Sequence, residues 1–141
     1  MPKVFFYHNV QDRLRAAAAL IAKTYAQGKN FTVFVPDPEQ AAFLDRLLWT
    51  QAPLGFLPHC RADSELASVT PIILTERMDA PLLQNERLLN LGGSVPDNIE
   101  RFQSLIEIVD QSEKGRGDAR LRTRHYKEMG YPVQFIDMNE R

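Results

Sequence analysis

The sequence has a single cysteine, Cys60, among its 141 residues. One cysteine excludes an intramolecular disulfide framework and is typical of a reducing compartment. Apolar runs are short as well: the stretch 16–22 is one of the longest, and it falls far below the roughly 20 residues that span a bilayer. The first residues also lack the charged, apolar and small-residue zones of a signal peptide. We therefore expect a cytoplasmic protein without a membrane partner.

Glycine-rich phosphate loops are missing too. Neither G-x-G-x-x-G nor G-x-x-x-x-G-K-[ST] occurs, and the turn after the first predicted strand, residues 8–12, contains no glycine. A dinucleotide-binding enzyme needs glycine there so that the backbone can approach a pyrophosphate. Gly92 and Gly93 follow a predicted strand, but two adjacent glycines are typical of a plain turn. This pattern argues against a nucleotide enzyme, and we expect no cofactor.

Histidine is scarce, with His8, His59 and His125 far apart in the sequence. Only His59 and Cys60 are neighbours, and adjacent side chains rarely reach one ion, so we expect no metal site. Nucleophilic pairs meet in space, so the sequence leaves open a small α/β enzyme with a site around these two residues. A lone cysteine in a loop is more often structural, and we therefore expect no catalytic residue.

The residues that are present predict one α/β domain spanning residues 1–141. This length suits a single core, and 44% hydrophobic and 25% charged residues are typical of a globular protein. Short β-branched and aromatic runs alternate with helical periodicity, which favours a parallel sheet with right-handed crossovers. We expect a doubly wound, Rossmann-like fold whose mostly parallel central sheet has about five strands, at 4–8, 31–35, 71–75, 87–91 and 104–109.

Helical periodicity and cap signals place the helices between these strands. Asp37 is the expected N-cap of the second helix, and Gly28 is the expected stop of the first. The irregular stretch 51–69 is predicted to be a long surface connection because it is interrupted by proline and glycine. The predicted helices lie at 13–26, from 38 onward, at 96–102 and at 118–129, and a C-terminal extended stretch lies at 132–136.

Charge is unevenly distributed along the chain. The net charge is −1, but residues 113–127 hold six basic and two acidic side chains, so this segment carries +4 and the rest −5. A basic patch on an acidic body favours a defined anionic partner over broad contact along a duplex. On a helix, Arg120, Arg124 and Lys127 share one face, whereas Arg122 points nearly the opposite way.

Two other interpretations of this basic segment stay open. A solvated helix face accounts for most charge runs, although the planar fork of arginine suits carboxylate and phosphate. A small nucleic-acid-binding protein would use the same helix directly on phosphates. Base stacking would then need aromatic residues among the basic ones, and Tyr126 is the only candidate.

Trp49 and Phe56 are large apolar residues at a predicted helix end and in the connection that follows. Such residues often lie at protein interfaces. They also cap hydrophobic cores, and composition does not decide between the two interpretations.

Several segments, in order along the whole chain, resemble the chi subunit family of the bacterial replicative DNA polymerase III clamp-loader assembly. Each segment alone is a weak motif, and their number and order make the resemblance specific. They are Phe5-Phe6-Tyr7, Leu47-Leu48-Trp49, Phe56-Leu-Pro-His59, Pro71-Ile-Ile, Leu88-Leu-Asn-Leu91, Arg101-Phe102, Ile106-Glu-Ile-Val109, Ala119-Arg-x-Arg122, Tyr126-Lys127 and Gly130-Tyr131.

The resemblance implies a non-catalytic α/β adaptor with two protein partners. One is the small psi subunit, in an expected one-to-one heterodimer, which connects chi to the clamp loader; the positions matching its surface are Trp49 and Phe56. The other is the acidic C-terminal tail of single-stranded-DNA-binding protein, so nucleic acid is reached only indirectly. The positions matching the tail site are Val109, Arg116, Arg120, Thr123, Arg124 and Lys127.

Two features depart from the family pattern. Family members carry an aromatic residue where this chain has Thr123, so we expect one wall of the tail pocket to be thin. Gly115 and Gly117 flank Arg116 and weaken a helix, which leaves the direction of that side chain open. Arg120 and Arg124 are therefore the residues on which the prediction depends most.

Overall fold

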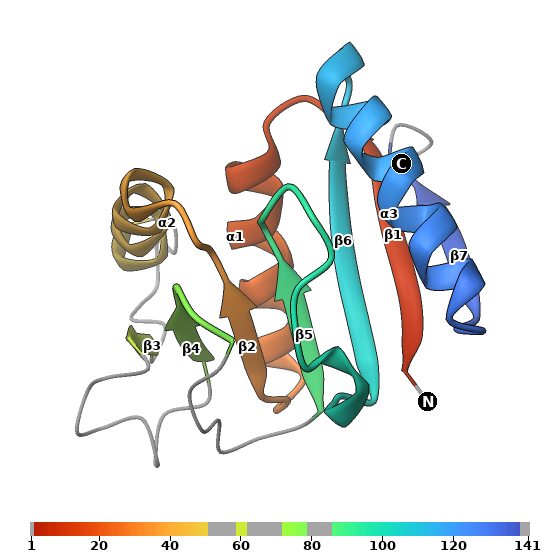
Figure 1. Cartoon of the computed structure of the whole chain (residues 1–141). Coiled ribbons are helices and arrows are strands. Elements are labelled where there is room, and N and C mark those ends of the chain that lie inside the picture. Colours follow the sequence, from red (N-terminus) through yellow and green to blue (C-terminus); the bar gives the residue numbers. More distant parts are fainter. Residues whose placement is uncertain (1, 51–58, 62–71, 79–85, 139–141) are drawn as a thin grey trace.

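The computed structural model describes residues 2–50, 59–61, 72–78 and 86–138. Within these ranges the chain forms a seven-stranded sheet in the order β3-β4-β2-β5-β6-β1-β7, and every neighbouring pair is parallel. The α/β class is confirmed (Figure 1). The strands are β1 (Lys3–Val10), β2 (Phe31–Phe34), β3 (His59–Arg61), β4 (Ile72–Thr75), β5 (Arg87–Asn90), β6 (Ser104–Asp110) and β7 (Val133–Asp137).

The estimate of about five strands is too low, and both additional strands lie at an edge of the sheet. β3 is a three-residue strand inside the segment predicted to be an irregular connection. β7 overlaps the stretch 132–136, which the sequence identifies only as extended. Short edge strands of this kind lack the alternating apolar pattern that reveals a strand in sequence.

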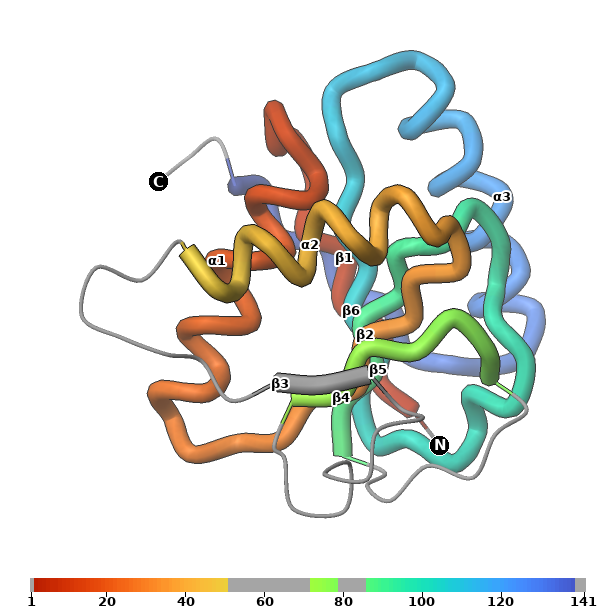
Figure 2. The backbone as a smooth tube through the Cα atoms, turned by 90° about the vertical axis from the view of Figure 1, so that its left-hand side faces the viewer, coloured from red at the N-terminus to blue at the C-terminus, as the bar shows by residue number. Residues whose placement is uncertain are grey.

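In the described part of the chain, three α-helices pack on the two faces of the sheet: α1 (Arg13–Ala26), α2 (Pro38–Thr50) and α3 (Glu113–Glu128). Residues of α1 and α2 join one core cluster and residues of α3 join another, which is the doubly wound arrangement expected. In the turned view of Figure 2, α1 lies to the left of the strands and α3 to the right. Asp37 accepts a hydrogen bond from Glu39 N, and Gly28 has φ 76° just after α1, as the sequence predicts.

The helix predicted at 96–102 is a single 3-10 turn, η2 (Ile99–Arg101). α3 begins at Glu113, five residues before the predicted start at Asp118. Ser112 caps it by accepting a hydrogen bond from Gly115 N at 2.9 Å. Capping therefore overrides the low helix propensity of the two glycines in the first turns.

The order of the last strands determines which side chains meet beneath α3. β1 lies between β6 and β7, with Phe6 opposite Glu107 on one side and Phe135 on the other. His8 is in register with Val109 of β6. Because alternate residues of a strand point to the same face, these side chains gather on the face that α3 covers.

Candidate functional site

A cavity of about 290 Å³ lies between α3 and the strands β1, β6 and β7. It brings together four of the six residues predicted for the tail site: Val109, Arg116, Arg120 and Thr123. It is also lined by Phe6, His8, Ala119 and Phe135.

Aromatic rings form one wall of this cavity. The ring of Phe6 stacks on that of Phe135 with centroids 5.4 Å apart, and the ring of His8 meets Phe135 edge-on at 6.2 Å. Phe135 is 51% exposed although it is large and apolar. Thr123, where the sequence predicts a thin wall, therefore lines a cavity whose aromatic surface is supplied by Phe135 of β7.

The positive charges lie along the exposed side of this cavity. Arg116 and Arg120 are exposed residues of α3 that line it. The Lys127 ammonium stands 5.9 Å from the centroid of the Phe135 ring, at the cavity's edge. None of these three cations forms a salt bridge with another residue in the described ranges. They are consequently available to an anionic ligand.

Arg124 is exposed on the same helix but does not line the cavity. The sequence ranks it with Arg120, because both lie on one broad helix face. The structure separates them: Arg120 and Arg116 flank the cavity, and Arg124 lies beyond it. Gly115 and Gly117 lie inside α3, so the direction of Arg116 is defined by a regular helix.

Arg122 points away from the other cations, as predicted, and is buried beneath α3. Its Nε donates to Glu107 Oε1 at 3.0 Å, and its Nη1 donates to Gly93 O at 3.1 Å. Glu107 also accepts from Tyr126 Oη at 2.6 Å and from Asn90 Nδ2 at 2.9 Å. This network fastens α3 to β6 with the remaining cations facing outward.

Burial also determines whether Tyr126 can stack on a nucleic-acid base. Its side chain is fully buried and its hydroxyl is bound to Glu107. Desolvation by burial, together with the neighbouring Glu107 carboxylate, raises the pKa of the Tyr126 hydroxyl. The only aromatic residue within the basic segment is therefore not exposed for stacking on a base.

Open α/β sheets usually bind their ligands outside the carboxyl ends of the strands. In this chain the guanidinium of Arg13 lies at the carboxyl ends of β5 and β6. This side chain donates to the backbone oxygens of Ile108 at 2.9 Å, Leu91 at 3.0 Å and Gly92 at 3.0 Å. A phosphate group at this position would have to displace an arginine that already donates hydrogen bonds from all three of its guanidinium nitrogens. Gly92 N in turn donates to Asn90 Oδ1, as in a plain turn.

The sequence also raises a metal site and a catalytic pair at His59 and Cys60 as alternatives to the basic helix. In the ranges that the structure describes, no group of three His, Cys, Asp or Glu side chains is arranged to hold a metal ion. The backbone of His59 and Cys60 belongs to β3. The structure does not describe their side chains, so the catalytic pair stays a prediction. None of the described helices is both long and apolar enough to cross a membrane.

Trp49 lies in α2, far from α3 in the fold, and is 53% exposed. A residue that capped the core would be largely covered, so this exposure favours the interface interpretation for Trp49. Phe56 lies outside the described residues, and its assignment stays a prediction.

Sequence comparison adds an independent finding. The family model described as "DNA polymerase III chi subunit, HolC" matches residues 1–134. A Pseudomonas aeruginosa protein named DNA polymerase III subunit chi is 30% identical over 138 residues, covering 95% of each chain. Proteins of the same name from Haemophilus influenzae and Escherichia coli are 26% identical over 115 residues and 24% identical over 124 residues, covering 82% and 85% of this chain and 80% and 84% of theirs.

Proposed function

The chain belongs to the DNA polymerase III chi subunit family and is thus an accessory subunit of DNA replication, and we propose that it bridges the psi subunit of the clamp loader to the C-terminal tail of single-stranded-DNA-binding protein. In this role the chain itself is not an enzyme; it acts by holding two proteins at once. As part of the replication machinery of a bacterium it would work in the cytoplasm.

The observation that carries the tail assignment is the combination of an aromatic cavity with two arginines on its edge, Arg116 and Arg120, that form no salt bridge within the described residues. The family resemblance implies a tail that is acidic and ends in phenylalanine with a free carboxylate. The terminal ring enters the cavity against Phe135, and burying a phenylalanine contributes about 1.5–3 kcal/mol. A hydrogen bond from Arg120 or Arg116 to the terminal carboxylate adds about 1.5–3 kcal/mol.

The upstream acidic residues of the tail make weaker contacts. Exposed ion pairs with Lys127 and Arg124 contribute about 0.2–1 kcal/mol each and are screened by salt. After the cost of ordering a flexible peptide, an affinity on the order of micromolar follows. Several tails on one oligomeric partner raise the effective affinity through local concentration, while each single contact stays easily broken.

Arg120 and Arg124 provide a matched pair of variants for testing this site. We expect Arg120→Ala to weaken binding of a fluorescent acidic peptide ending in phenylalanine by roughly tenfold or more, because a charged hydrogen bond is lost. Arg124→Ala removes the same charge from the same helix outside the cavity. It should weaken binding by roughly fivefold or less.

Fluorescence anisotropy at low and moderate salt measures both variants, and a peptide without its terminal phenylalanine is the ligand control. Equal losses for the two variants would contradict the cavity assignment and indicate a diffuse electrostatic contact. Tight binding of a bare oligonucleotide would instead favour the alternative function, direct nucleic-acid binding. The burial of Tyr126 counts against that alternative.

A further inference from the structure

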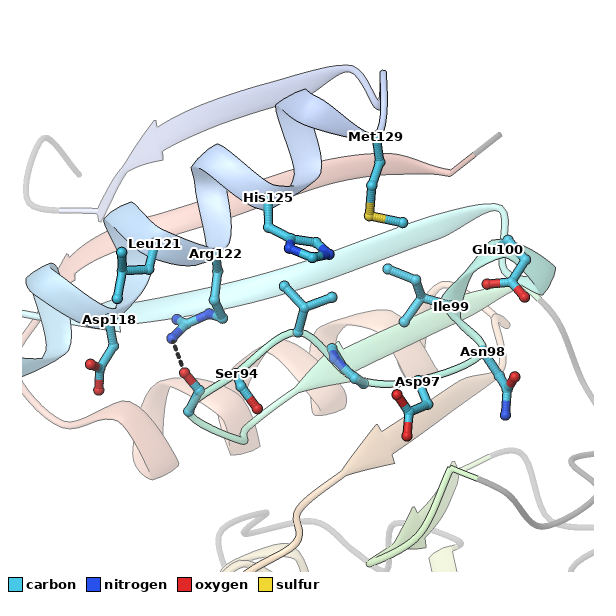
Figure 3. A pocket seen from close by; sticks show the side chains of 13 residues that line it. Ser94, Asp97, Asn98, Ile99, Glu100, Asp118, Leu121, Arg122, His125 and Met129 are labelled. Carbon is cyan, nitrogen blue, oxygen red and sulfur yellow. Dashed lines mark hydrogen bonds between the residues drawn. The ribbon is translucent and has the colours of Figure 1, made fainter.

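The cavity lined by Arg116, Arg120 and Phe135 is called the basic cavity here. A second cavity, of about 520 Å³, lies on the opposite side of α3. One wall is α3 itself, and the other is the segment 93–100, which leads from β5 into η2 (Figure 3). The side chains contributed by α3 and its C-cap are those of Asp118, Leu121, Arg122, His125 and Met129. We call this cavity the acidic groove.

Exposed apolar side chains line one wall of the acidic groove. Leu121 and Met129 are 63% and 38% exposed, and they lie two helical turns apart on one stripe of α3. Across the groove, Ile99 is buried and forms part of the other wall. Large apolar residues left exposed along one wall of a cavity are typical of a protein interface.

The charge of the groove is opposite to that of the basic cavity. Its carboxylates belong to Asp97, Glu100 and Asp118, and none of the three forms a salt bridge elsewhere in the described part of the chain. The guanidinium of Arg122 also reaches this groove, but its charge is paired with Glu107. The groove therefore disfavours nucleic acid and acidic tails, and it favours a cationic ligand.

Hydrogen bonds hold the 93–100 wall in place. Arg122 Nη1 donates to Gly93 O at 3.1 Å, the bond drawn in Figure 3, and Asn90 Nδ2 donates to Ser94 O at 3.1 Å. At the other end, Asn98 Nδ2 donates to Met78 O at 3.3 Å. A wall fixed at both ends needs little ordering when a ligand binds, which lowers the free-energy cost of binding.

We propose that the acidic groove is a docking site for a cationic, amphipathic segment of another protein. Apolar side chains one helical turn apart on that segment lie against Leu121 and Met129. Lysine or arginine residues beside them pair with the three carboxylates. This inference does not depend on the tail contact, because the two cavities lie on opposite sides of α3 and carry opposite charge.

A synthetic peptide with leucines one helical turn apart and lysines between them is the direct probe. We expect saturable binding, with backbone amide shifts in an NMR titration confined to residues 93–100 and 118–129. Leu121→Ala, at an exposed position where the fold is not at risk, should weaken binding by roughly fivefold. Asp97→Asn combined with Glu100→Gln should weaken it by roughly threefold or more and reduce its salt dependence.

Matched controls distinguish binding at this site from non-specific binding of the peptide. Tyr25→Ala removes an exposed aromatic residue from α1, and Arg120→Ala alters the basic cavity; neither should change binding of the cationic peptide. A peptide with glutamate in place of lysine should not bind the groove. Amide shifts outside the groove, equal binding of the two peptides, or unchanged affinity of Leu121→Ala would overturn the proposal. Self-association abolished by Leu121→Ala would also overturn it, because the occupant would then be a second copy of this chain.

Discussion

Glu107 is the residue on which the orientation of α3 depends. Its carboxylate is fully buried and binds Arg122, Tyr126 and Asn90. Burial raises the pKa of this carboxyl, and the charge of Arg122 together with the hydrogen bonds from Tyr126 and Asn90 opposes the rise. Breaking one partner of such a pair leaves a buried charge without compensation.

Arg122→Met tests this pair. We expect it to lower the free energy of unfolding by about 3–5 kcal/mol at neutral pH, because Glu107 then remains buried without its counter-charge. The double variant Arg122→Met with Glu107→Gln should be more stable than the single one. Glutamine keeps an acceptor for Tyr126 without a charge. Urea denaturation of the three proteins gives the comparison.

The pH dependence distinguishes lost charge from lost packing in that experiment. A carboxyl whose pKa is raised on folding binds its proton more tightly in the folded state. Its ionisation therefore costs stability as the pH rises from about 4.3, the value in the unfolded chain, through the folded pKa. Without Arg122 the pKa of Glu107 should be higher still. The difference in free energy of unfolding between the unmodified protein and Arg122→Met should therefore be smaller at pH 5 than at pH 7. An equal loss at both values would contradict the charge explanation and indicate lost packing.

At the scale of elements, the sequence predicts most of the sheet and misses what depends on context. Long apolar strands and helices with caps were predicted correctly because their signals are local. The predicted start of α3, at Asp118, is wrong because Gly115 and Gly117 lower helix propensity in the first turns. Asp110 and Ser112 form a cap there that sequence spacing alone does not reveal. Asp110 Oδ1 accepts from both the backbone N and the hydroxyl of Ser112, at 3.0 and 2.6 Å.

The two glycines of α3 predict opposite effects of the same substitution. No atom lies within 4 Å of a Cβ added at Gly117, so Gly117→Ala should stabilise the protein by about 0.5–1 kcal/mol through better helix propensity. A Cβ at Gly115 would collide with the Asp110 carboxylate and the Ser112 hydroxyl. Gly115→Ala should therefore destabilise by about 1 kcal/mol through loss of the cap. The unfolding temperatures of both variants measure these effects. A change of the same sign in both would contradict the assigned cap.

The candidate site shows the same division between local and distant information. Its cations could be predicted because they lie within one charged segment. Phe6, His8 and Phe135 could not, because only the placement of β1 between β6 and β7 brings them beneath α3. A signal was present for Phe135, a large apolar residue in a short C-terminal strand, but its ring partners Phe6 and His8 are more than a hundred residues away in sequence.

At the scale of the whole molecule, the proposed partner surfaces lie on opposite faces of the sheet. Trp49 belongs to α2, which packs with α1 on one face, whereas the basic cavity lies under α3 on the other. Figure 1 shows α2 and α3 at opposite sides of the molecule. This separation allows psi and the tail to bind together without competing. It also implies that substitutions at one surface leave the other intact.

The most direct measurement of the bridging proposal is capture of single-stranded-DNA-binding protein on immobilised psi, with and without this chain. We expect capture only when the chain is present. Arg120→Ala should strongly reduce capture while still binding psi, and Trp49→Ala should reduce psi binding while still binding the tail peptide in solution. Capture without the chain, or one substitution that removes both contacts from a folded protein, would contradict the account.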